Sequence, residues 1–237
     1  MPKRGKKYEE AAKLVDRTKF YTPEEAVALV KQLAYSKFDA TVELHMRMNL
    51  DPRQADQLIR GVVALPQGTG KPKRILVFGE GEAERLAREA GADYVGSDEF
   101  VAKIQEGWLD FDVVLAVPQI MGKIGRLGRV LGTRGLMPSP KTGTIVQPED
   151  LPRTIDEIRK GRAEYRLDKT SNLHVPIGKA SFTPEQLMEN LTAVMDAIMR
   201  AKPASVKGIY IKKIAIAPTM GPSVRLDVFQ ASNLRPQ

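Results

Sequence analysis

The stretch TVELHMRMNL at residues 41–50 alternates strictly between polar and apolar side chains. Successive side chains of a β-strand point to opposite faces, so this alternation gives the stretch one apolar face and one polar face. Asp51 and Pro52 then end the pattern. The sequence therefore predicts a half-buried strand over residues 41–50.

Two helices with matching first turns lie before and after this strand in the chain. Residues 20–25 read FYTPEE and residues 182–186 read FTPEQ. In each, a threonine can cap the helix, a proline suits the first turn and a Glu or Gln completes a capping box. An internal duplication would explain the likeness, but the shared capping rule is the simpler explanation.

The C-terminal part of the chain carries further strand patterns. They cover residues 163–167, 172–177, 209–217 and 224–228. The first two are predicted to form a hairpin, and the last two flank the turn from Pro218 to Pro222. Together with the strand at 41–50 and the two capped helices, these patterns predict an outer α+β domain.

The middle of the chain has a different character. Strand patterns over residues 74–78, 92–95 and 113–117 alternate with helical patterns over 82–90 and 153–160. Such alternation is typical of a mostly parallel α/β unit. The predicted fold is therefore of two domains: a discontinuous α+β outer domain, residues 1–67 plus 160–237, and an inserted α/β domain, residues 68–159.

Charge is distributed unevenly between these parts. The chain has a net charge of +8, but residues 79–112 hold ten acidic and three basic side chains, a net charge of −7. The rest therefore carries +15, and residues 1–21 alone, predicted to be a partly helical arm, hold seven basic and three acidic side chains. A polyanion would avoid the acidic segment, so nucleic-acid binding is expected in the outer domain.

Two glycine motifs resemble nucleotide sites but lack essential parts. The strand at 74–78 leads into Gly79-Glu80-Gly81, yet the third glycine of a dinucleotide motif is absent and carboxylates crowd the helix start. Residues 135–142 approach a P-loop, but Pro140 replaces its second glycine and has no amide hydrogen for a phosphate. No cofactor is expected.

Residues 118–148 are rich in glycine and proline and hold five basic and no acidic side chains. They predict a loop whose leucines and isoleucines pack on the inserted domain. A mobile basic loop in which some of these cations touch RNA phosphate is the alternative.

The sequence shows no pattern typical of a catalytic site, a metal site or a membrane segment. The chain has no cysteine, and its two histidines, His45 and His174, show no catalytic or metal-binding spacing, so neither a catalytic residue nor a metal is expected. No apolar run approaches the roughly 18 residues that span a membrane, and no signal peptide is recognisable. A nucleotide-dependent enzyme and a DNA-binding regulator remain the competing hypotheses, the second without a helix-turn-helix or zinc signature.

Three segments together carry a resemblance over essentially the whole chain. They are KFDATVE at residues 37–43, GRLGRVLGTRGLMP at 125–138 and APTMGP at 217–222. The chain resembles the family of bacterial large-subunit ribosomal protein one, found in the mobile lateral stalk beside the tRNA exit site.

The resemblance implies a Rossmann-like inserted domain and an outer domain that grips large-subunit ribosomal RNA. It further implies contact with exit-site tRNA, repression of the chain's own operon through its mRNA, a cytoplasmic location on the ribosome and a monomer away from it. Neither an enzyme, a membrane protein nor a DNA-binding protein is implied. The RNA contacts implied by position are Lys37, Phe38, Thr41, Asp168, Lys169, Thr219, Met220 and Gly221.

The turn at 219–221 also suits RNA in physical terms. Pro218 and Pro222 restrict its backbone, and rigidity lowers the entropy lost on binding. We expect Thr219 to donate a hydrogen bond to a ribose hydroxyl, Met220 to lie against ribose or base, and Gly221 to leave room for the sugar-phosphate chain.

Overall fold

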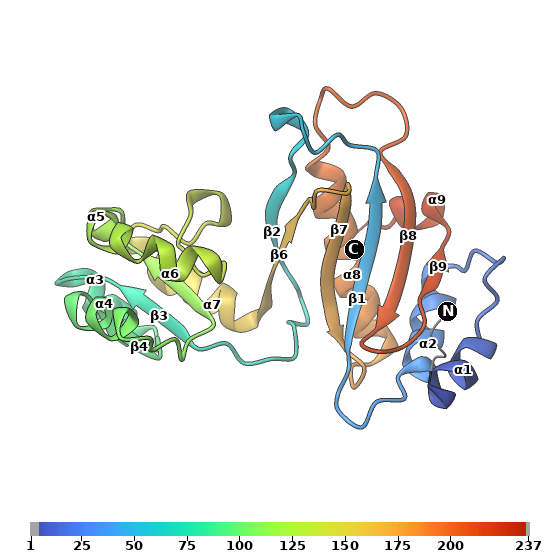
Figure 1. Cartoon of the computed structure of the whole chain (residues 1–237), viewed down its shortest axis with the longest axis horizontal. Coiled ribbons are helices and arrows are strands. Elements are labelled where there is room, and N and C mark those ends of the chain that lie inside the picture. The colour runs from blue at the N-terminus through green and yellow to red at the C-terminus, as the bar shows by residue number, and fades with distance from the viewer. Residues whose placement is uncertain (1–4, 236–237) are drawn as a thin grey trace. The chain divides into compact units, whose positions relative to one another are not determined.

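The structure is a computed structural model that describes residues 5–235, in two compact units (Figure 1). Unit 1 comprises Met1–Gly70 and Gly161–Gln237, and unit 2 comprises Lys71–Lys160. These boundaries lie within a few residues of those expected from the sequence. The mixed α+β and α/β fold class is confirmed.

Unit 1 is built on a four-stranded antiparallel sheet in the order β7-β1-β8-β9. The alternating stretch at 41–50 forms strand β1, whose apolar side chains are buried and whose polar ones are not. The strands are β1 Thr41–Met48, β7 Asn172–Lys179, β8 Ile211–Pro218 and β9 Val224–Leu226.

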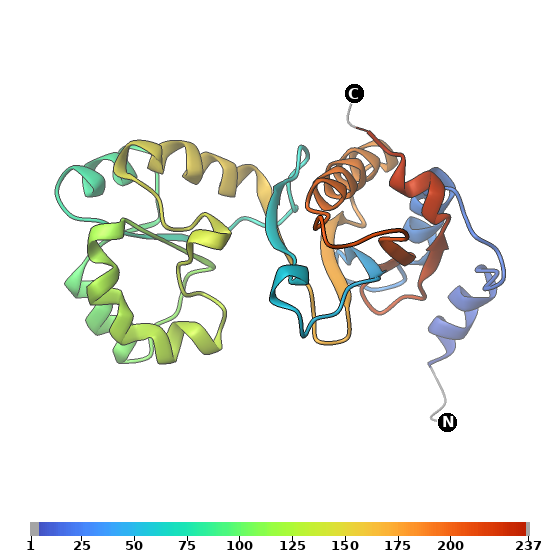
Figure 2. The same ribbon diagram turned by 90° about the horizontal axis from the view of Figure 1, so that it is seen from above.

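Helices α2, Pro23–Leu33, and α8, Pro184–Arg200, supply the other half of this core. Both predicted capping boxes are present, with the Thr22 and Thr183 side chains accepting hydrogen bonds from the backbone three residues on. The apolar stripe of α8 is fully buried against the sheet. Figure 2 shows these helices gathered on one side of the strands.

The predicted hairpin of residues 163–177 was wrong in its pairing. Strand β6, Arg162–Arg166, pairs with β2, Arg60–Ala64, in a separate two-stranded sheet, whereas β7 pairs with β1. Strand β2 was not predicted, because its five residues show no alternation. The predicted strand over 224–228 ends early, because Asp227 caps helix α9, Val228–Ser232.

The chain leaves and re-enters unit 1 through one tightly packed point. Gly161 has a φ of +115°, and a Cβ there would lie 2.4 Å from Cα of Gly68. Asn190 of α8 is fully buried beside this crossing. Its side chain accepts a hydrogen bond from Gln67 N and donates to the carbonyl oxygens of Gly68 and Ile177.

Unit 2 contains a parallel sheet in the order β4-β3-β5, as expected for an α/β unit. Its strands are β3 Ile75–Phe78, β4 Tyr94–Gly96 and β5 Val113–Ala116. Alternate residues of β3 enter two apolar clusters, Leu76 and Phe78 in one and Ile75 and Val77 in the other. The first cluster includes α4, Asp98–Gln105, and the second includes α3, Glu82–Glu89, and α7, Leu151–Gly161.

The predicted loop over residues 118–148 is largely helical at its start. Helices α5, Met121–Ile124, and α6, Gly128–Thr133, are joined by a 3-10 turn over Gly125–Leu127. The expected packing of the apolar residues is confirmed, because Ile120, Ile124, Leu127 and Leu131 are buried. The loop was predicted from its glycines, but a Cβ added at residue 122, 125, 128 or 132 would meet open space, so none of these helical positions requires glycine for packing.

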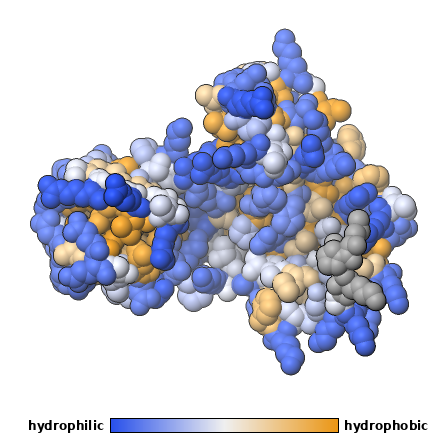
Figure 3. Space-filling model, viewed as in Figure 1, coloured by the Kyte–Doolittle hydropathy of each residue, from blue (hydrophilic) through white to orange (hydrophobic). Residues whose placement is uncertain are grey.

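The N-terminal arm contains helix α1, Lys6–Lys13, which buries Ala11 against unit 1; residues 1–4 lie outside the described part. The described helices include none of the length and apolar character needed to cross a membrane. Figure 3 shows hydrophilic residues over most of unit 1 on the side that faces the viewer.

We expect Gly161→Ala to destabilise unit 1 by more than about 2 kcal/mol, because the positive φ strains any side chain and the added carbon meets backbone. Gly132→Ala is the control, because it fills open space on a helix and should stabilise unit 2 by about 0.5–1 kcal/mol. Urea unfolding followed by far-ultraviolet circular dichroism measures both. Equal stability of wild type and Gly161→Ala would show that the crossing tolerates a side chain.

Candidate nucleic-acid interface

The eight residues expected to contact RNA form two groups at opposite ends of strand β1. Lys37, Phe38, Thr41 and residues 219–221 gather at its start, since Thr41 and Thr219 are hydrogen-bonded. Asp168 and Lys169 lie in the turn that leads into β7, beside the last residue of β1. There Met48 N donates a hydrogen bond to Ser171 O. Arg47 lies six positions after Thr41 along the strand, a span of about 20 Å.

Thr219 locks the turn between β8 and β9 onto β1. Its hydroxyl accepts a hydrogen bond from Thr41 N and donates one to Thr41 O, both at 3.1 Å, and Thr219 N also donates to Thr41 O at 2.9 Å. The expected donation from Thr219 to a ribose hydroxyl is therefore corrected, because Thr41 already receives that hydrogen. The hydroxyl positions the turn and has only acceptor capacity left.

Met220 is the exposed tip of this turn. It has a φ of +69°, which is uncommon for a residue other than glycine, and its side chain is 69% exposed. Tyr35 donates from its hydroxyl to the Met220 carbonyl oxygen at 2.5 Å, which holds the tip in place. An apolar side chain is thus presented to solvent on a fixed backbone.

Gly221 serves packing inside the protein. Its N–H donates to Pro218 O at 3.0 Å, which closes the turn. A Cβ at this position would lie 2.5 Å from Cγ of Pro218 and 3.1 Å from Leu33 O. The expectation that Gly221 leaves room for RNA is corrected, because protein atoms occupy that space.

The loop between α2 and β1 brings Lys37 and Phe38 to the same end. Both are exposed, Phe38 to 57%. The loop is fixed on the β7 side, where the Asp39 carboxylate accepts hydrogen bonds from Ser181 N and Oγ. This end of the sheet therefore presents a cation, an aromatic ring and a methionine together.

Thr41 has a second partner that the sequence did not reveal. Lys179 of β7, opposite Thr41 in the sheet, donates from Nζ to Thr41 Oγ1 at 2.9 Å. Lys179 is thus a further cation at this end. Alternation marks both positions as polar, but only the strand register brings them together.

Asp168 organises the turn at the other end. Its carboxylate accepts hydrogen bonds from the backbone and side chains of both Thr170 and Asn172. Burial raises the pKa of this carboxyl, but the hydrogen bonds from Asn172 and Thr170 outweigh it and lower the pKa to about 2. The carboxylate is therefore ionised at neutral pH, and Lys169 beside it is exposed.

The polar face of the sheet connects the two ends. Four basic residues lie along it, Arg47 of β1, Lys212 and Lys213 of β8 and Arg225 of β9, and no described carboxylate forms an ion pair with any of them. They line a groove of about 390 Å³, together with His45 and His174. Four cations without a counter-ion along one open groove suit a phosphate backbone.

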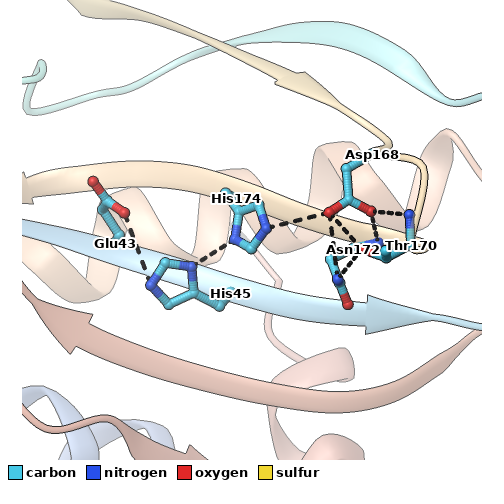
Figure 4. A network of polar contacts seen from close by, with 6 residues as sticks. All are labelled: Glu43, His45, Asp168, Thr170, Asn172 and His174. Carbon is cyan, nitrogen blue, oxygen red and sulfur yellow. Dashed lines mark hydrogen bonds and ion pairs between the residues drawn. The ribbon is translucent and has the colours of Figure 1, made fainter. Parts of the chain in front are cut away.

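His45 and His174 form a pair on this face that the sequence did not predict (Figure 4). They lie opposite each other on β1 and β7, with their Nδ1 atoms 2.8 Å apart. Their contact depends on the strand register, which the sequence alone does not show. No group of three or more potential metal ligands occurs among residues 5–235.

In unit 2 the two glycine motifs carry internal contacts. Lys123 bridges Glu80 at 2.7 Å and Asp98 at 3.0 Å, next to the Gly79–Gly81 turn. In the second motif, Ser139 O accepts a hydrogen bond from the Thr142 hydroxyl. Both motifs therefore place their polar groups on protein partners. Arg126, Arg129 and Arg134 lie on or beside the short helices that replace the predicted loop.

Comparison with known proteins assigns the family. The model of the ribosomal protein L1p/L10e family matches residues 30–222, a range that includes the β1 and 219–221 segments. The chain belongs to the ribosomal protein L1p/L10e family.

Relatives agree over nearly the full length. The chain is 58% identical to "Large ribosomal subunit protein uL1" of Chloroflexus aggregans, covering 99% of this chain and 100% of that protein. It is also 58% identical to the protein of the same name from Thermomicrobium roseum, covering 96% of this chain and 95% of that protein. Membership in this family confirms the resemblance seen in the sequence and the expectation that the chain is no enzyme.

We expect Thr219→Val to destabilise unit 1 by about 1–2 kcal/mol, because the reciprocal hydrogen bonds with Thr41 are lost. Thr219→Ser keeps the hydroxyl and should stay within about 0.5 kcal/mol of wild type. Urea unfolding followed by circular dichroism measures both. The fluorescence of Trp108, the only tryptophan and a part of unit 2, serves as an internal control. Wild-type stability of Thr219→Val would mean that the hydroxyl contributes nothing.

We expect the contribution of Asp168 to the free energy of unfolding to be lost at low pH. The folded carboxyl, with a pKa of about 2, binds a proton less tightly than the unfolded one, with a value of 3.8. Its contribution is therefore present above a pH of about 4 and is lost as the pH falls toward 2. The stability difference between wild type and Asp168→Asn should shrink over that range in urea unfolding. A difference independent of pH would contradict the hydrogen-bonded turn.

Proposed function

We propose that this protein is a structural component of the large ribosomal subunit and binds large-subunit ribosomal RNA through unit 1. The observation that carries the proposal is the open polar face of the sheet, with four cations that lack counter-ions between the two groups of expected contacts. The names of the relatives support the assembly, since both are large-subunit ribosomal proteins.

The two ends of the sheet are suited to different parts of a folded RNA. Phe38 and Met220 can lie against an exposed base or ribose, while Lys37 offers charge to a phosphate. At the far end, Lys169 offers a second phosphate contact, and the hydrogen bonds of the Asp168 carboxylate hold the turn that carries it. Because the two ends are about 20 Å apart, they favour a folded RNA surface over a short single strand.

Within this proposal, Thr41, Thr219 and Gly221 act mainly by fixing the shape of the first end. Thr41 and Thr219 are hydrogen-bonded to each other, and Gly221 lies where there is no space for a side chain. A rigid end loses less conformational entropy on binding than a mobile loop would. The eight residues therefore divide into those that present groups to RNA and those that hold them in place.

The finer role follows the resemblance to the stalk protein. We infer that the chain works on cytoplasmic ribosomes, contacts exit-site tRNA as it leaves, and is a monomer away from the ribosome. We also infer that it represses translation of its own operon. An mRNA segment with the same shape as the ribosomal site would bind the same face of unit 1.

We expect binding of a large-subunit ribosomal RNA fragment to the full chain to weaken steeply with salt, because several phosphates are neutralised. Lys37→Gln and Lys169→Gln should each lower the affinity and make the slope of log K against log salt less steep by about 1. Lys103→Gln removes a cation of unit 2 that is paired with Glu99, and should change neither quantity. Filter binding over a salt series measures all three.

A flat salt dependence, or equal effects of all three substitutions, would contradict RNA binding by unit 1. The leader of the chain's own operon mRNA should compete for the ribosomal RNA fragment and be weakened by the same two substitutions. If both RNAs bound at once, the shared-face account of repression would be wrong.

A further inference from the structure

The contact between His45 and His174 restricts how many protons the pair can hold. Their Nδ1 atoms lie 2.8 Å apart with the ring centroids at 5.0 Å, so one nitrogen donates a hydrogen and the other accepts it. If both Nδ1 atoms carried hydrogens, these would face each other and the bond would break. The pair can therefore hold one positive charge but resists a second.

Each end of the pair faces a carboxylate. His45 Nε2 lies 3.8 Å from Glu43, and His174 Nε2 lies 3.7 Å from Asp168 (Figure 4). A proton added to the outer nitrogen of the donating ring would therefore meet a negative charge. The pair and its flanking carboxylates form one continuous row across β1 and β7.

Other surroundings oppose that proton in the free protein. Burial lowers the pKa of His45, and His174 lowers it further, while Glu43 raises it. Four cations also line the groove beside the pair: Arg47 on β1, Lys212 and Lys213 on β8 and Arg225 on β9. The carboxylates of Glu43 and Asp168 at the two ends of the pair favour the added proton, whereas the cations of the groove oppose it.

A phosphate in the groove would change this balance. The groove of about 390 Å³ is lined by both histidines and all four cations. A phosphodiester held there would neutralise the cations that repel the added proton and would itself attract it. The pair also lies between the two ends of the proposed RNA interface, because Asp168 touches His174 and Thr41 begins the strand that carries His45.

We propose that the His45–His174 pair takes up a proton when an RNA phosphodiester enters this groove, so that the resulting imidazolium becomes part of the phosphate-binding site. This inference rests on the proposed function, since it concerns RNA held on the same face. The proton comes from solvent and no covalent bond changes. RNA binding by this protein is therefore coupled to pH.

The direction of the coupling follows from linkage. Bound phosphate raises the affinity of the pair for a proton, so RNA binding strengthens as the pH falls and the gain disappears as the pH rises. For one fully linked proton the affinity changes by about tenfold per pH unit. We expect a three- to tenfold gain in affinity between pH 7.5 and pH 6.

The test is calorimetric titration of the full chain with the ribosomal RNA fragment at pH 6.5, in two buffers of different ionisation enthalpy. The difference in observed heat gives the number of protons taken up. We expect clear proton uptake in wild type and its loss in both His45→Gln and His174→Gln, which keep polar side chains at these positions. Arg47→Gln is the matched control, because it removes a cation of the same face that does not titrate, and should weaken binding while proton uptake remains.

The outcomes separate this inference from the proposed function. If wild type binds the RNA without proton uptake, or if both glutamine variants retain the uptake, the proton coupling is wrong and RNA binding stands. If wild type does not bind the RNA fragment at all, the proposed function fails and this inference fails with it. Nuclear magnetic resonance of the histidine ring signals with and without RNA gives an independent reading, since RNA should shift the titration of His45 and His174 to higher pH.

Discussion

The buried amide of Asn190 ties together the segments on which both units depend. It binds the outgoing chain at Gln67 and Gly68 and, at the same time, the carbonyl oxygen of Ile177 in β7. The returning chain passes in contact with Gly68 at Gly161, where there is no space for a side chain. An uncompensated buried amide would cost about 1–3 kcal/mol. This constraint closes unit 1 from two distant parts of the sequence and leaves unit 2 as a complete insertion with its own sheet.

Internal hydrogen bonds also determine which groups of the proposed RNA interface face solvent. Several of its polar groups bind other protein groups: the Thr219 hydroxyl binds Thr41, and the Asp168 carboxylate binds Thr170 and Asn172. What remains facing solvent is simpler in kind, namely lysines, an aromatic ring and the tip methionine. Affinity would then come from charge and apolar contact, and shape discrimination from the rigidity of the two ends.

Much of this organisation could be predicted from local sequence patterns. Strict alternation predicted β1, and the capping pattern predicted α2 and α8. The change of pattern near residue 68 suggested where an inserted domain begins. The partners of strands could not be predicted, because register depends on contacts far apart in sequence. That is why β6 was paired with β7 instead of β2, and why the His45–His174 contact escaped notice. The glycines of residues 118–135 suggested a loop because propensity alone cannot show that Leu127 and Leu131 would be buried.

Those same glycines have a consequence for local motion in unit 2. Helices α5 and α6 are only a few residues long and carry glycine on their open sides, so their intrinsic tendency to form helix is weak. Their order depends on three or four buried apolar anchors against β3 and α4. Backbone amides in this segment should therefore exchange with solvent through small openings long before the sheet itself unfolds. The segment therefore combines buried apolar side chains with a backbone that opens easily. It also carries Arg126, Arg129 and Arg134.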